Sequence, residues 1–87
     1  MALEIKLAGT ALKHFQSLDK PTQKRIQEKL TAIAAQPFDA RLSKPLVGVS
    51  KRTARVGDYR ILFEVESPLL IVADIGPRGR IYRRLNR

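Results

Sequence analysis

The sequence predicts an α+β domain in which a strand and a two-helix antiparallel hairpin precede a mostly antiparallel sheet. Two patterns carry this prediction. Between residues 8 and 34 the apolar side chains recur every three or four positions, which is the period of an amphipathic helix. Between residues 51 and 66 they alternate with polar side chains, which is the period of a half-buried strand. Because a chain of 87 residues buries one core, we expect a single domain over residues 1–87.

The first half of the chain is predicted to form one strand and two helices. Residues 2–7 alternate between apolar and polar side chains and predict a short strand. Residues 8–18 have helical spacing and predict the first helix. Pro21 suits the first turn of a second helix, which should end before Pro37 because the residue before proline disfavours helical backbone. Since the link between the helices is short, they should form an antiparallel hairpin.

The second half is predicted to supply the rest of the sheet. Residues 36–50 form a loop that contains one short strand at residues 46–49. Two longer strands follow at residues 51–56 and 59–66, and a tight turn at Gly57-Asp58 joins them. This arrangement gives the element order βααβββ once the last strand is added.

The last predicted strand and the tail differ in character. Residues 69–75 are nearly all apolar, which is typical of a central strand that is covered on both faces, and Gly76-Pro77 should end it. Residues 78–87 form a basic, arginine-rich C-terminal tail. In the preceding strand one face is apolar and is expected to join the core: Tyr59, Ile61, Phe63 and Val65.

The charge of the chain is strongly positive. Seventeen basic residues outnumber eight acidic ones, which gives a net charge of +9. The excess is concentrated in residues 41–87, where eleven basic residues face four acidic ones. Such a field attracts polyanions and speeds their capture, so nucleic acid is the first candidate partner. An anionic membrane surface, an acidic protein, and a charge that serves only solubility remain as alternatives.

The residue content excludes several kinds of chemistry. The chain has no cysteine, which removes disulfides, thiolate catalysis and thiolate-bound metals. Its one histidine, His14, is expected to lie on the surface of the first helix, because metal sites need several ligands at fixed spacing. We therefore expect no metal and no cofactor. No apolar run approaches the ~20 residues of a membrane helix, and the N-terminus lacks a signal-peptide pattern, so we expect a cytoplasmic protein without membrane contact.

Arginine, lysine and tyrosine remain, and this set suits the cleavage of RNA. RNA carries its own nucleophile, the 2′-hydroxyl, so attack on the neighbouring phosphate needs only proton transfer and stabilisation of the developing charge. Cationic side chains supply that stabilisation. Crowding of like charges can also prepare a lysine for proton exchange near neutral pH, and a tyrosine can stack on a base or exchange a proton.

Two motifs resemble those of a known family. Residues 55–63, R-V-G-D-Y-R-I-L-F, are similar to the R-V-G-D-Y-R hairpin of the RelE/ParE toxin superfamily. Residues 75–83, I-G-P-R-G-R-I-Y-R, resemble the I-G-H-R-x-x-V-Y-R end of that superfamily. The predicted order of strands and helices matches as well, so the resemblance covers nearly the whole chain. It implies a RelE-like, microbial ribonuclease-type fold in one RelE-like toxin domain.

The resemblance also implies a function, the toxin of a type II toxin–antitoxin system. In the RelE-type mRNA interferase branch, the activity is ribosome-dependent, metal-independent cleavage of messenger RNA through 2′-hydroxyl attack. The implied partners are the ribosome, mRNA and a cognate acidic, RelB-like antitoxin in a hetero-oligomer. Two alternatives stay open, a ParE-like inhibitor of DNA gyrase without nuclease activity and a non-catalytic RNA-binding module. The Arg78…Tyr82 ending favours the nuclease, and the scarcity of aromatic residues disfavours the binding module.

Carried over position by position, the resemblance assigns catalytic roles to Lys51, Arg60, Arg78 and Tyr82. The chain also departs from the family pattern. Thr53 stands where a second lysine is expected, and Pro77 stands where a histidine is common. Gly79 replaces a basic residue and Phe63 replaces a tyrosine. General contacts with RNA phosphates are expected from Lys44, Arg52, Arg55, Arg80, Arg83 and Arg84.

Each of the four catalytic candidates also has an ordinary structural interpretation. Arg60 could be a solvated strand residue or a partner of Glu64, and Lys51 could be an edge-strand lysine that discourages aggregation. Tyr82 could cap the core with its ring. Arg78 follows the last strand on a loop, a place where binding groups concentrate.

Overall fold

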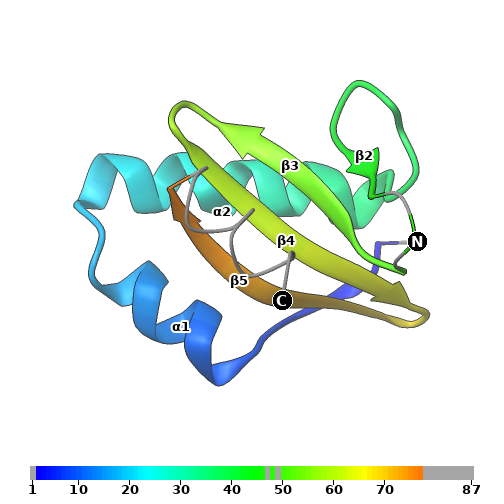
Figure 1. Cartoon of the computed structure of the whole chain (residues 1–87), viewed down its shortest axis with the longest axis horizontal. Coiled ribbons are helices and arrows are strands. Elements are labelled where there is room, and N and C mark those ends of the chain that lie inside the picture. The colour runs from blue at the N-terminus through cyan, green and yellow to red at the C-terminus, as the bar shows by residue number, and fades with distance from the viewer. Residues whose placement is uncertain (1, 47, 49, 78–87) are drawn as a thin grey trace.

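A computed structural model describes residues 2–46, 48 and 50–77 of the chain (Figure 1). The elements are β1 (Glu4–Leu7), α1 (Gly9–Gln16), α2 (Lys20–Ala35), β2 (Lys44–Pro45), β3 (Arg52–Val56), β4 (Tyr59–Glu66) and β5 (Leu69–Pro77). The strands form one sheet in the order β1-β5-β4-β3-β2. Figure 1 shows α2 crossing one face of this sheet, while α1 lies beside β5.

The predicted α+β fold is confirmed, with a strand and two helices before the remaining strands. The pairs β2–β3, β3–β4 and β4–β5 are antiparallel, and the pair β1–β5 is parallel. A parallel pair needs a long crossover, and here the chain between the two partners includes both helices. The sheet is therefore mixed but mostly antiparallel, as predicted.

The helices lie close to their predicted positions. Asp19 caps the start of α2, where its carboxylate accepts a hydrogen bond from Thr22 N at 3.2 Å, and Pro21 occupies the first turn. α2 ends before Pro37, as predicted, whereas α1 is shorter than the predicted residues 8–18. Neither helix is of the length and apolarity that crossing a membrane requires.

The predicted position of the short strand is wrong. This strand lies at Lys44–Pro45, where it pairs with Thr53 and Arg52, and not at residues 46–49. The reason is local. Leu46 N donates a hydrogen bond to Lys51 O at 3.0 Å, which closes a turn that contains Gly48 with a φ of +81°, so the chain reverses here instead of continuing as a strand. Residues 47 and 49 lie outside the described part of the chain.

The predicted end of the last strand is also wrong. β5 continues through Gly76 and Pro77, which pair with Arg60 and Tyr59 of β4. On its other side, β5 pairs with β1 only as far as Val72. Proline is tolerated at such a strand end because only one neighbouring strand is paired there.

The core lies between α2 and the sheet. Its largest fully buried apolar side chains are Phe63, Ile26, Ile33, Ile61, Leu70, Ile75 and Val72. Burial of each one contributes about 1.5–3 kcal/mol. The alternation predicted for β4 is confirmed for Ile61 and Phe63, while Tyr59 at the start of the strand is only half-buried.

A bulge in β5 decides which of its residues face the core. Leu62 pairs with Asp74 whereas Phe63 pairs with Val72, so Ala73 is an extra residue in β5. Asp74 consequently lies on the face of the sheet opposite α2, which we call the outer face. The outer face also carries Lys51, Thr53, Arg55, Arg60, Leu62 and Glu64.

Replacing Phe63 by alanine should remove much of the stability of the fold. Phe63 is completely buried, and truncation of a buried phenylalanine costs about 3–5 kcal/mol. Phe38→Ala is the matched control, because Phe38 is 67 % exposed and the same truncation should cost less than about 1 kcal/mol there. Urea unfolding followed by circular dichroism measures both variants, and equal midpoints would contradict this description of the core.

Candidate functional site

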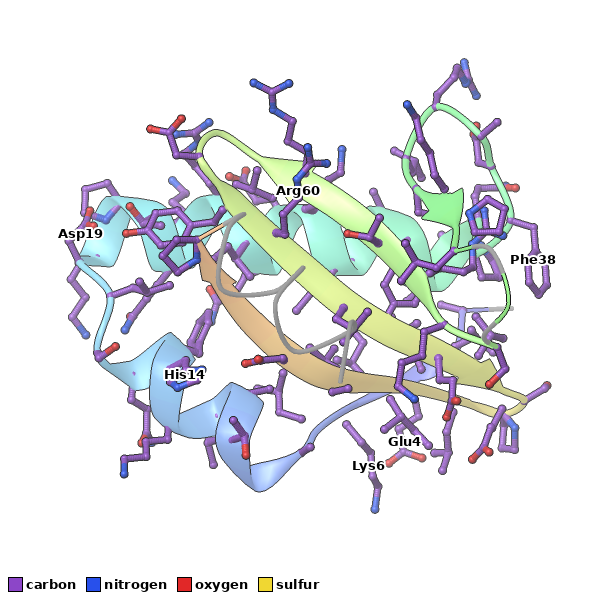
Figure 2. The ribbon with its side chains drawn as sticks, viewed as in Figure 1. Glu4, Lys6, His14, Asp19, Phe38 and Arg60 are labelled. Carbon is purple, nitrogen blue, oxygen red and sulfur yellow. The ribbon has the colours of Figure 1, made fainter. Side chains whose placement is uncertain are left out.

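Two arginines face each other on the outer face. Arg55 of β3 pairs directly with Arg60 of β4, and Figure 2 shows Arg60 projecting from the sheet on the side away from α2. Arg55 is exposed and its Nε donates a hydrogen bond to Gly57 O at 3.1 Å, while Arg60 is half-buried. Like charges directly opposite each other destabilise a sheet. The pair therefore concentrates positive charge on the outer face.

Lys51 lies on the same face but has an acidic neighbour. Its Nζ is 3.6 Å from Glu64 Oε1, and Ser50 Oγ donates to the same oxygen at 2.8 Å. Glu64, which the sequence offered as a partner for Arg60, thus forms its ion pair with Lys51. Both side chains are partly exposed, and such pairs contribute at most about 1 kcal/mol. Lys51 can therefore exchange this carboxylate for another anionic partner at little cost.

Thr53 occupies the position where the resemblance implies a second lysine. The residue is only 6 % exposed, and its Oγ1 has no hydrogen-bond partner within the described part of the chain. On the outer face it pairs with Leu62 across the strands. The site therefore has a buried hydroxyl, and no second amine, at the centre of β3.

Arg52 points away from Lys51 and Arg55, as strand alternation predicts. Its Nε donates to Ser43 Oγ at 3.0 Å, and its guanidinium lies 5.4 Å from the centre of the Phe38 ring. These contacts attach the loop between α2 and β2 to the edge of the sheet. Arg52 thus has a structural role beside the RNA contact that the sequence predicts.

The remaining predicted site residues divide into two groups. Lys44 of β2 is exposed and pairs with Thr53 at the edge of the sheet, next to the Arg55–Arg60 pair. The others lie outside the described residues and stay predictions: Arg78, Arg80, Tyr82, Arg83 and Arg84. The structure therefore brings together Lys44, Arg55 and Arg60 around Thr53, with Lys51 further along the same face.

A contact between His14 and Asp74 was not predicted from the sequence. His14 was expected on the open surface of α1, but its side chain is 23 % exposed and its Nδ1 lies 2.8 Å from Asp74 Oδ1. Asp74 is 2 % exposed, and the same oxygen also accepts a hydrogen bond from Ile75 N at 2.8 Å. The sequence contained one indication of this pair. Asp74 is a single carboxylate within the apolar residues 69–75, and a buried carboxylate needs a polar partner. No three His, Asp or Glu side chains gather into a metal-binding group among the described residues.

Comparison with known proteins places this geometry in a family. Residues 5–82 match the family model of the ParE toxin of type II toxin–antitoxin systems, parDE. The RelBE2 toxin–antitoxin complex of Mycobacterium tuberculosis contains a similar chain, with 19 % identity over 90 % of this chain and 100 % of that one, and a TM-score of 0.78. No curated protein sequence matches the chain significantly.

Two archaeal structures are also similar. The RelE–RelB complex of Pyrococcus horikoshii matches with 25 % identity over 92 % of this chain and 99 % of that one, and a TM-score of 0.74. The RelB–RelE complex of Methanococcus jannaschii matches with 25 % identity over 90 % of this chain and 95 % of that one, and a TM-score of 0.72.

The fold is thus that of RelE-type toxins. The chain belongs to the ParE toxin family and is the toxin component of a toxin–antitoxin system. This confirms the RelE/ParE superfamily that the two motifs predicted.

Replacing His14 by alanine should destabilise the fold. The change leaves the buried Asp74 carboxylate with one hydrogen bond fewer, and such a loss costs about 1–3 kcal/mol. Lys13→Ala is the matched control, since Lys13 is the exposed neighbour on the same helix and should change stability by less than about 0.5 kcal/mol. Thermal unfolding measures both, and an unchanged midpoint for His14→Ala would show that the pair does not stabilise the fold.

Proposed function

We propose that this toxin is an endoribonuclease, an mRNA interferase, that inhibits translation by cutting messenger RNA on the ribosome without a metal ion. The observation that carries the proposal is the cross-strand pair of Arg55 and Arg60 on the outer face. A guanidinium group such as that of Arg60 is suited to the extra charge that a phosphoryl group develops during reaction, and Arg55 beside it adds positive charge that attracts the phosphate. The net charge of +9 supports a polyanionic substrate.

The reaction assigns a separate task to each residue. The 2′-hydroxyl of the RNA attacks the adjacent phosphorus, the bond to the 5′-oxygen breaks, and a 2′,3′-cyclic phosphate forms. Arg60 stabilises the charge on the phosphoryl oxygens, and the resemblance assigns the same task to Arg78, which directly follows Pro77 in the sequence. Lys51 and Tyr82 then remain to exchange protons with the 2′-hydroxyl and the leaving oxygen.

The other basic residues bind rather than react. Contacts with phosphates orient a nucleic acid without reading its sequence. We assign this role to Lys44, Arg52, Arg55, Arg80, Arg83 and Arg84. Lys44 and Arg55 would position mRNA and ribosomal RNA against the outer face in the cytoplasm, and Arg52 would contact RNA at the adjacent edge of the sheet.

We propose a cognate, acidic, RelB-like antitoxin as the protein partner, in a toxin–antitoxin hetero-oligomer. Similar chains from Mycobacterium tuberculosis, Pyrococcus horikoshii and Methanococcus jannaschii were solved as complexes with RelB or within RelBE2. An acidic partner would complement the basic chain and associate rapidly at low salt.

Expression of this chain without an antitoxin should arrest growth by halting translation, and Arg60→Ala or Arg78→Ala should relieve the arrest. Loss of one charge-stabilising group slows a reaction by about 10²–10³-fold. The control is Lys24→Ala, which removes an exposed charge from α2, the helix on the opposite face. Incorporation of labelled amino acids measures translation, and circular dichroism verifies folding. Undiminished arrest in both folded arginine variants would contradict the assigned roles.

Inhibition of DNA gyrase is the second candidate function. The family whose model matches residues 5–82 is that of ParE, which favours this alternative. The same cultures distinguish the two functions. Loss of DNA supercoiling before loss of translation would favour gyrase, and primer extension on a reporter mRNA would then find no new 5′ ends.

The ends of the RNA products test the chemistry. Attack by the 2′-hydroxyl leaves a 2′,3′-cyclic phosphate or a 3′-phosphate and a free 5′-hydroxyl, whereas two-metal hydrolysis usually leaves a 3′-hydroxyl. A 2′-deoxy substitution at the scissile nucleotide should abolish cleavage by this toxin. Cleavage of the deoxy substrate, or a 3′-hydroxyl product, would rule out the proposed mechanism. Product ends are the better measurement because ribosomes themselves require magnesium.

A further inference from the structure

A basic cavity opens at the edge of β3, where β2 stops. β2 pairs only with Arg52 and Thr53, so it leaves the rest of this edge uncovered by a strand. The cavity has a volume of about 190 Å³. It lies between α2, the loop before β2, and strands β3 and β4. Its lining includes five basic residues and no acidic one: Lys29, Arg41, Lys44, Arg55 and Arg60.

The charge in this cavity is only partly neutralised. Arg41 forms an ion pair with Asp39, with Nη2 2.8 Å from Oδ2, and its hydrogen bonds lower the pKa of Asp39 to about 2. Lys29 and Lys44, in contrast, have no ion-pair partner among residues 2–46, 48 and 50–77. Positive charges that converge on a concave wall focus the electrostatic potential and raise the local concentration of anions.

Thr53 adds a hydrogen-bond donor to the cavity wall. Its hydroxyl is buried and has no hydrogen-bond partner in the described part of the chain, which is unfavourable for a polar group. Because Thr53 lines the cavity, its hydroxyl is placed to donate a hydrogen bond to an anion bound there. A phosphate oxygen is an acceptor of the kind that the hydroxyl lacks.

We propose that this cavity binds a backbone phosphate of the RNA adjacent to the phosphate that reacts. Lys29 and Lys44 supply its charge and Thr53 donates a hydrogen bond. Arg60 lines the cavity and also stands on the outer face, so the two phosphates are neighbours along one strand. The identity of the ligand as RNA rests on the proposed function, whereas the anion site rests on the geometry alone. Contacts of this kind fix the position of the strand relative to the catalytic groups.

Titration of the purified chain with inorganic phosphate, followed by amide chemical shifts, tests the site. Lys29→Ala and Lys44→Ala should each weaken binding about tenfold, because each removes a charged hydrogen-bond donor. The matched control is Lys24→Ala, an exposed lysine on α2 that lies outside the cavity and should leave the affinity within about twofold. Equal weakening by all three variants would mean general charge attraction and would overturn the site.

The hydroxyl has a separate test. Thr53→Val keeps the shape of the side chain but removes the donor, so it should weaken phosphate binding severalfold while raising the thermal midpoint of the free protein. Thr53→Ser should retain phosphate binding. A valine variant that binds phosphate like the wild type would overturn the role of Thr53.

The experiments separate this inference from the proposed function. Phosphate binding is measured without ribosomes or cleavage, so a chain that binds phosphate through Lys29 and Lys44 but cuts no mRNA would overturn the proposed function alone. A chain that cuts mRNA, yet whose Lys29 and Lys44 variants bind phosphate normally, would overturn the cavity alone. In a cleaving toxin, Lys29→Ala should raise the RNA concentration needed for half-maximal rate without changing the product ends.

Discussion

The packing of β4 on α2 is the contact on which the other features depend. Ile61 and Phe63 point toward the helix and are completely buried. Because side chains of a strand alternate between its two faces, Arg60 must then lie on the outer face. A shift of one residue in register would exchange the core and the charged face. Core packing therefore fixes the position of Arg60, and the cost of burying a guanidinium against α2 reinforces it.

Because of the bulge at Ala73, β5 carries core residues on the face toward α2 and Asp74 on the outer face. Without the extra residue, the spacing between Val72 and Ile75 would place one of them on the outer face. With the extra residue, Val72 and Ile75 both pack into the core. Asp74 then lies on the outer face, where His14 of α1 contacts its carboxylate. The bulge thus joins α1 to the edge of the sheet through a polar contact, beyond the point where β1 stops pairing.

Patterns within the sequence predict the local parts of this structure. The β3–β4 hairpin follows from alternation and from Gly57, whose φ of +58° suits the tight turn. The pairing of Arg55 with Arg60 was not predicted, although it follows from the register of this hairpin. The position of strand β2, the bulge and the last residues of β5 were not predicted, because pairing with neighbouring strands determines them. Lys29 was missed for the same reason, since only the short β2 exposes the edge of β3 to this lysine of α2.

Two neighbouring features of β3 and β4 depart from the usual rules for charge pairing and for the burial of polar groups. Two arginines oppose each other across β3 and β4, and a threonine hydroxyl beside them is buried. The buried hydroxyl without a partner destabilises the free protein, and both the arginine pair and the hydroxyl would interact favourably with a phosphate oxygen. Natural sequences keep such conflicts mainly where function needs them. Because the surrounding core residues obey the rules of packing and alternation, the conflicts stay confined to the outer face and the edge of β3.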